Sequence, residues 1–193
     1  MAASDGCPFD DLPFSQLRQP LNQLSDEQRA QVEAYSVGGF ELINEALRGQ
    51  RPMTEALFES IEILRSAIRK FPLATDARVT REIGASDIGL TSANEAPSTV
   101  GRSFVELGFL STCMSENPPR SPIHAEPLEL ELRVPAGTYA LAAGSLAEFR
   151  LELELLVIDA REISVIHCRY NEHTARWRSA RFYPKVICHE DGE

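Results

Sequence analysis

Residues 151–158 read LELELLVI and residues 128–134 read LELELRV, so the chain holds two nearly identical strand-like stretches. Side chains alternate between the two faces of a β-strand. In 128–134 one face is polar throughout and the other is apolar, which predicts a half-exposed antiparallel strand. In 151–158 the face that begins with Glu152 and Glu154 ends apolar. This second stretch is therefore predicted to be a central strand that is buried at its carboxyl end.

Glu152 and Glu154 share one face of this strand, about 7 Å apart between α-carbons at a rise of roughly 3.3 Å per residue. Half-buried carboxylates at the point where a core opens are typical of catalytic sites. Alternating glutamates also occur on solvent-exposed sheet faces, and the stretch alone leaves both interpretations open. The other copy is interpreted as a scaffold strand, so Glu131→Ala is predicted to leave activity nearly intact.

The rest of the chain separates into a helical part and a strand-rich part. Apolar residues recurring every three or four positions predict helices over about 25–34, 38–48 and 54–70. Short runs between turn residues predict strands near 78–83, 104–111, 128–134, 138–143, 150–158 and 162–169. Helices followed by strands is the α+β pattern, and the chain lacks the βαβ alternation and glycine-rich loop of a Rossmann fold. Residues 1–23 are predicted to form a loosely ordered arm, and residues 24–193 a single domain.

The 193 residues have an ordinary globular composition but carry a net charge of −10. Nucleic-acid and membrane phosphates are bound by clustered Lys and Arg, so this balance argues against a general binder of either surface. Residues 161–185 are basic and are interpreted either as a solvated face or as a surface for an acidic partner. No apolar run reaches the roughly 18–20 residues of a membrane span, and the N-terminal MAASDGCPFDD does not read as a secretory signal peptide.

The chain has four cysteines, none in a CxxC pair, and we interpret them as free thiols of a reducing compartment. Cysteines and histidines near the C-terminus fit no standard zinc-ligand spacing, so no metal site is predicted. His124, His167 and His173 have no evident partner and are interpreted as structural.

Two further stretches precede the Glu-x-Glu strand in chain order. Arg81 lies in the strand-like run VTREI, and Ser111 and Thr112 lie at the end of another, GFLSTC. Arginine is the natural bidentate partner of a phosphate. A hydroxyl at a strand end can lie against a carboxylate of the neighbouring strand. The order is thus arginine, serine-threonine and glutamate-x-glutamate, on three separate strands after a helical region.

In this order the motifs resemble the mono-ADP-ribosyltransferases of the Arg–Ser-Thr-Ser–Glu class, which includes cholera-like and clostridial binary toxins and related bacterial effectors. The resemblance covers about residues 35–170, because Tyr35 through Arg48 also resembles the early helix of that family. It implies a helical N-terminal region followed by a mainly antiparallel β-sandwich core. It also implies NAD-dependent transfer of ADP-ribose to a side chain of a target-cell protein, with release of nicotinamide.

The family roles carry over residue by residue. The resemblance implies that Glu154 is the catalytic carboxylate, which holds the nicotinamide ribose and stabilises the oxocarbenium ion formed as nicotinamide leaves. Ser111 is expected to orient Glu154 and help to build the nicotinamide pocket, with Thr112 supporting the strand. Arg81 is expected to hold the diphosphate of NAD. Glu152 is expected to align and deprotonate the acceptor, and in the family a glutamate there accompanies arginine acceptors.

Other residues are candidates at the edge of this site. Phe149 matches an aromatic residue of the family's substrate-recognition loop. Asn44 and Arg48 are expected either to face the NAD cleft or to serve as helix stop and surface charge. Arg120 is either a further phosphate contact or a solvated loop residue. Glu82 stands where the family usually has glycine, so its bulk is expected to narrow the nicotinamide pocket.

Departures from the family pattern keep other functions open. Cys113 replaces the last serine of Ser-Thr-Ser, where little loss is expected because that position mainly supports the strand. Glu82 and the lack of an aromatic residue to cover nicotinamide in loop 114–127 favour a degenerate relative. The alternatives are transfer to threonine, asparagine or nucleic acid, plain NAD hydrolysis, and a degenerate relative that binds a partner without catalysis. The resemblance further implies a monomer that a bacterium secretes or injects and that acts in the target-cell cytosol.

Overall fold

The computed structural model describes residues 9, 11–145, 153–171 and 175–186. Its α-helices are α1 (Asp26–Ala34), α2 (Phe40–Leu47) and α3 (Glu55–Ile68). Its strands are β1 (Ala77–Gly84), β2 (Ser103–Glu106), β3 (Leu110–Cys113), β4 (Pro127–Val134), β5 (Ala140–Leu141), β6 (Glu154–Val157), β7 (Arg161–Val165), β8 (Cys168–Asn171) and β9 (Arg176–Val186). Short helical turns are η1 (Leu21–Gln23), η2 (Tyr35–Gly39), η3 (Ala85–Ile88), η4 (Ala93–Thr99) and η5 (Ala143–Ser145). None of the helices in these residues is long and apolar enough to cross a membrane.

Helix starts follow local capping chemistry. Helix α1 begins at a capping box, in which the Ser25 hydroxyl accepts from the Gln28 N–H and the Gln28 side chain accepts from the Ser25 N–H. Helix α3 begins at Thr54, whose hydroxyl accepts from the N–H of Leu57 at 3.2 Å. The three predicted helices are confirmed, with small differences at their ends.

A glycine pair joins α1 to α2 through the π-helical turn η2. Gly38 has a φ of 151°, which side-chain-bearing residues rarely adopt. A Cβ on Gly39 would lie 2.8 Å from the carbonyl oxygen of Ala34. The turn therefore depends on both glycines, and it fixes where Tyr35 and Ser36 point.

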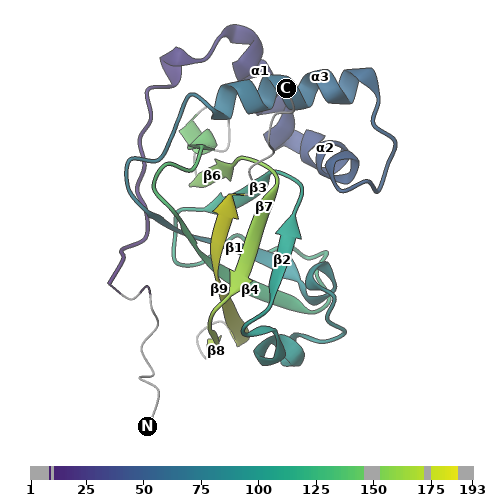
Figure 1. Cartoon of the computed structure of the whole chain (residues 1–193), viewed down its shortest axis with the longest axis vertical. Coiled ribbons are helices and arrows are strands. Elements are labelled where there is room, and N and C mark those ends of the chain that lie inside the picture. Colours follow the sequence, from purple (N-terminus) through teal and green to yellow (C-terminus); the bar gives the residue numbers. More distant parts are fainter. Residues whose placement is uncertain (1–8, 10, 146–152, 172–174, 187–193) are drawn as a thin grey trace.

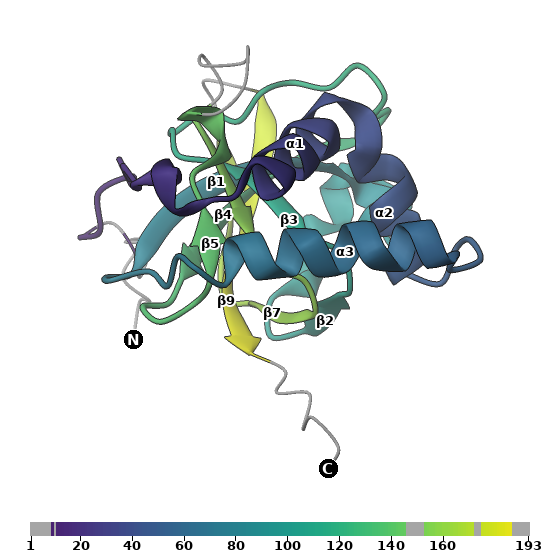
Figure 2. The same ribbon diagram turned by 90° about the horizontal axis from the view of Figure 1, so that it is seen from above.

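The strands form one mainly antiparallel sheet in the order β2-β7-β9-β4-β1-β3-β6-β5, with β8 paired to β9. Figures 1 and 2 show the three helices gathered on one side of this sheet. That side packs on Phe109, Leu141 and Leu156. The opposite face carries a second core that includes Leu130 and Leu155. Because β6 is buried on both faces, its prediction as a central strand that is apolar at its carboxyl end is confirmed.

The strand predicted over 128–134 is confirmed as β4, which pairs antiparallel with β1, but its predicted half-exposure was wrong. Strand β4 lies between β1 and β9 in the middle of the sheet, and Glu129 and Glu131 are only 2% and 1% exposed. Its polar face is compensated by arginines, because Glu131 accepts from Arg78 at 2.6 Å and lies 3.7 Å from Arg169. Alternation of charged and apolar residues indicated exposure to solvent, whereas the partners of Glu131 are arginines on β1 and β8 of the same sheet.

Other strand limits also differ from the predictions. The run 104–111 is divided between β2, which pairs with β7, and β3, which pairs with β1 and β6. Strand β9 was not predicted, since its basic composition favoured a solvated face. Arg161 is in fact 3% exposed, and Arg176 pairs with the buried Glu82. Arg176 thus compensates an acidic side chain inside the molecule, whereas Arg161 donates to the Ile158 carbonyl.

The described part of the N-terminal arm lies against the sheet. Phe9 is fully buried, and the guanidinium of Arg78 lies 4.3 Å from the centre of the Phe14 ring. The Gln19 side chain donates to the Ala140 carbonyl and accepts from the Ala142 N–H. These contacts hold this stretch beside β1 and β5.

Candidate active site

A cavity of about 380 Å³ brings most of the predicted residues together. It lies between the α1–α2 junction, strands β1, β3 and β6, and loop 114–126. Its lining consists of Tyr35, Ser36, Phe40, Asn44, Thr80, Arg81, Glu82, Ser111, Thr112, Cys113, Pro118, Pro119, Ser121, Ile123, His124 and Glu154.

Two hydroxyl groups hold the carboxylate of Glu154 from opposite sides. Ser111 on β3 donates to Oε1 at 2.6 Å, and Ser36 in η2 donates to Oε2 at 3.2 Å. Strand register explains the first contact, since Cys113 pairs with Glu154 and Ser111 is on the same face two residues earlier. The contact between Ser111 and Glu154 is the one expected from the sequence. Ser36 was missed, although the Gly38–Gly39 pair after it signals a special backbone.

Arg81 projects into the same cavity from β1. Its Nη1 atom is buried and has no hydrogen-bond partner among the residues that the structure describes. A buried N–H group without a partner is unfavourable, and nearly all such groups in folded proteins are paired. A positively charged donor left open beside a cavity is suited to an anion, and a guanidinium is suited to phosphate oxygens above all.

The match to a family model agrees with this arrangement. Residues 15–176 match the model of the ADP-ribosyltransferase exoenzyme family. The matched range covers most of the chain. The chain belongs to this family. No curated protein sequence matches it.

Solved structures confirm that the transferase has the expected fold type, with a helical N-terminal region and an antiparallel sheet core. Plx2a, an ADP-ribosyltransferase toxin from Paenibacillus larvae, is 18% identical with a TM-score of 0.71, covering 86% of this chain and 89% of that one. The Clostridium limosum C3 exoenzyme is 13% identical with a TM-score of 0.71, covering 90% and 98%. C3stau2 from S. aureus, solved with NAD, is 16% identical with a TM-score of 0.68, covering 90% and 99%.

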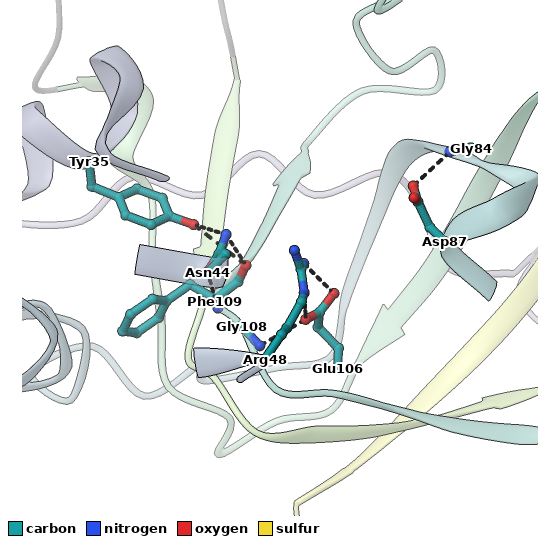
Figure 3. A network of polar contacts seen from close by, with 8 residues as sticks. All are labelled: Tyr35, Asn44, Arg48, Gly84, Asp87, Glu106, Gly108 and Phe109. Carbon is teal, nitrogen blue, oxygen red and sulfur yellow. Dashed lines mark hydrogen bonds and ion pairs between the residues drawn. The ribbon is translucent and has the colours of Figure 1, made fainter. Parts of the chain in front are cut away.

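Aromatic residues of the transferase reach the cavity from the helical side and not from loop 114–127. Tyr35 is 1% exposed, and its hydroxyl accepts from the Asn44 amide at 3.0 Å (Figure 3). Burial raises the pKa of the Tyr35 phenol above its ordinary value of 10.0, so the ring stays neutral at physiological pH. Phe40 stands edge-on to Tyr35 at 6.4 Å and is 42% exposed at the cavity. Neither ring was singled out as a site residue from the sequence.

Asn44 and Arg48 hold the turn before β3. The Asn44 Oδ1 atom accepts from the Phe109 N–H at 2.9 Å, and Asn44 also lines the cavity. Arg48 forms two hydrogen bonds to Glu106, at 2.9 and 2.8 Å, and Glu106 accepts from the Gly108 N–H (Figure 3). These bonds to Glu106 raise the pKa of Arg48. Arg48 does not line the cavity, and its guanidinium is directed at Glu106.

Three further predicted residues lie at or near the cavity. Thr112 is buried and donates to the Leu155 carbonyl at 2.7 Å, which ties β3 to β6. Glu82 lines the cavity, but its carboxylate is bonded to the Ser121 N–H and to Arg176. Arg120 is exposed and outside the lining.

The remaining residues named from the sequence either lie outside the described ranges or have other roles. Glu152 and Phe149 lie outside the described residues. His124, interpreted as structural, lines the cavity. Cys113 and Cys168, the cysteines within the described ranges, are free thiols. No cluster of three metal-capable side chains occurs within the same ranges.

Proposed function

We propose that the chain is an NAD-dependent mono-ADP-ribosyltransferase that modifies a protein side chain. The observation that carries this proposal is a single cavity that holds both the Glu154 carboxylate, bonded by two hydroxyls, and the Arg81 Nη1 atom, which has no hydrogen-bond partner among the described residues. NAD presents the complementary features, because its diphosphate is anionic and its nicotinamide ribose becomes positively charged as the glycosidic bond breaks. The S. aureus relative solved with NAD supports the same ligand.

Each residue then has one task. Arg81 donates to the diphosphate, and Glu154 faces the nicotinamide ribose. When the bond from C1′ to the nicotinamide nitrogen breaks, its electron pair leaves with nicotinamide, and the Glu154 carboxylate stabilises the positive charge on the ribose. Ser111 and Ser36 hold that carboxylate in place before the reaction, so little reorganisation is needed in the transition state.

The acceptor is proposed to be an arginine side chain. Glu152 lies two residues before Glu154, and in related enzymes a glutamate there accompanies arginine acceptors. A guanidinium has a pKa above 12, so a second carboxylate is needed to gather it and take its proton as the new bond to C1′ forms. Threonine, asparagine and nucleic-acid acceptors are the alternatives that an acceptor assay distinguishes.

We further infer the setting from the family. An exoenzyme acts outside the cell that makes it, and NAD is abundant in cytosol, so we propose a target protein in the cytosol of another cell. A monomer meets the needs of the cavity, because residues of one chain complete its described lining.

The first experiment incubates a eukaryotic lysate with labelled NAD and either wild-type protein or Glu154→Gln. We expect labelled bands with wild type alone, because loss of one preorganised charge contact lowers turnover about 10²–10³-fold. Glu45→Gln, which changes a surface carboxylate paired with Arg51, serves as control and should label like wild type. Mass spectrometry of the bands identifies the acceptor residue.

A result without label, and with NAD consumption at background, would support the degenerate partner-binding alternative. Rapid NAD consumption without labelled protein would support a glycohydrolase. Glu152→Gln separates the two steps: we expect it to remove transfer to arginine while some NAD hydrolysis persists, and equal loss of both would contradict its role toward the acceptor.

A further inference from the structure

We propose that Glu82 is a positioning residue that fastens loop 114–126 against β1 and thereby sets the affinity of the cavity for NAD. The identity of the ligand rests on the proposed function, whereas the fastening itself concerns the free protein. The sequence alone suggested the opposite role for Glu82, an obstacle in the nicotinamide pocket.

Loop 114–126 forms one wall of the cavity through Pro118, Pro119, Ser121, Ile123 and His124. Two adjacent same-face residues of β1 hold this wall. Thr80, which is fully buried, donates to the Ser115 carbonyl at 2.8 Å. Glu82 Oε1 accepts from the Ser121 N–H at 2.8 Å. The stretch between Ser115 and Ser121 is thus attached to the sheet at both of its ends.

The second oxygen of Glu82 explains why a carboxylate occupies this place. Its Oε2 pairs with Nη1 of Arg176 on β9, and the Glu82 side chain is only 2% exposed. A buried carboxylate is tolerated when each oxygen has a partner and its charge is compensated. Arg176 therefore compensates the charge of Glu82 and directs its carboxylate at the loop, which links β9, past β4, to the cavity wall through Glu82 on β1.

A fastened wall favours ligand binding because the loop is ordered before the ligand arrives, so less conformational entropy is lost on binding. The hydrogen bonds that hold Glu154, from Ser111 and Ser36, are different from the two bonds that attach the loop, which involve Thr80 and Glu82. Release of the loop should consequently act on NAD affinity and not on the bond-breaking step.

The test compares Glu82→Ala and Glu82→Gln in steady-state NAD hydrolysis and in hydrogen exchange of the free proteins. For Glu82→Ala we expect the KM for NAD to rise about tenfold, kcat to stay within about threefold, and amides of 115–121 to exchange faster. Glu82→Gln retains an oxygen that can accept from the Ser121 N–H, so we expect it to restore much of the loop protection and of the KM.

Glu126→Ala is the matched control, because Glu126 holds the other end of the same loop through the Ala93 N–H at 3.0 Å but does not line the cavity. We expect its KM for NAD to stay near wild type. The proposal is overturned if Glu82→Ala leaves both KM and loop exchange unchanged, if it lowers kcat as much as kcat/KM, or if Glu126→Ala raises KM equally.

The two proposals fail in distinguishable ways. If wild type neither binds nor cleaves NAD, the proposed function fails, while faster exchange of 115–121 in Glu82→Ala still shows the fastening. If wild type cleaves NAD and Glu82→Ala matches it in KM and in exchange, the positioning role alone is wrong.

Discussion

At the scale of single residues, the site depends on how firmly one carboxylate is held. The two hydroxyls that contact Glu154 differ, since the Ser111 contact is 2.6 Å long and the Ser36 contact is 3.2 Å. Ser111 belongs to a strand of the central sheet, whereas Ser36 belongs to a turn between helices. We infer that Ser111 contributes more to the orientation of Glu154.

Replacing these serines tests that order. We expect Ser111→Ala to lower kcat for NAD hydrolysis about 10–100-fold and Ser36→Ala to lower it less, because a shorter hydrogen bond to a charged group is the stronger one. Thermal unfolding should shift little in either variant. Equal kcat values for both variants and wild type would show that neither hydroxyl matters for the reaction.

Arg81 offers a test in which stability and binding change in opposite directions. Its Nη1 atom is buried without a partner within the described structure, so Arg81→Met removes an unfavourable group. We expect the free energy of unfolding in urea to stay unchanged or to rise by about 1 kcal/mol. The Kd for ADP-ribose, measured by calorimetry, should increase at least about tenfold. A large loss of stability with unchanged affinity would make Arg81 structural.

At the scale of elements, α2 braces the turn that leads into the serine strand. Asn44 holds the backbone of Phe109, and Arg48 holds Glu106, which holds the N–H of Gly108 (Figure 3). The turn therefore approaches α2 closely. A Cβ on Gly108 would lie 2.7 Å from the Asn44 Oδ1 atom and 3.1 Å from the Glu106 Oε1 atom.

We expect Gly108→Ala to destabilise the protein by about 1–3 kcal/mol, since the added methyl group overpacks the turn. It should also lower kcat, because displacement of Phe109 moves Ser111 on β3, the strand that begins at the next residue. Urea unfolding and NAD hydrolysis measure the two effects. In an Asn44→Ala background the additional cost of Gly108→Ala should shrink. An equal loss of stability in both backgrounds would show that the added methyl group does not clash with the Asn44 side chain.

At the scale of the whole molecule, the sheet contains buried charges as well as two apolar cores. Glu131 and Arg78 form an ion pair in which the side chains are 1% and 9% exposed. Arg78 also donates to the carbonyls of Phe9 and Leu12, so the same pair holds the N-terminal arm against β1. One charged pair thus connects the arm, β1 and β4.

The sequence suggested that Glu131→Ala would leave activity nearly intact, and the buried ion pair leads to a different prediction. We expect this variant to lose about 3–5 kcal/mol of stability, since it leaves the Arg78 charge buried without its carboxylate. Glu154→Ala should have a free energy of unfolding near that of wild type. A loss of activity in Glu154→Ala is then catalytic, whereas one in Glu131→Ala is structural. Denaturant unfolding followed by circular dichroism measures the stability of both. A Glu131→Ala protein as stable as wild type would contradict the structural role of the pair.

Local signals in the sequence determined the helices, their caps and the chain order of Arg81, Ser111 and Glu154, because capping and periodicity act over a few residues. The burial of β4, the unpredicted β9 and the contact of Ser36 with Glu154 were decided by tertiary structure alone. The physical reason is distance along the chain. A charged strand is exposed or buried according to which distant segment lies beside it, and neither the Arg78–Glu131 pair nor the Glu82–Arg176 pair leaves a local pattern.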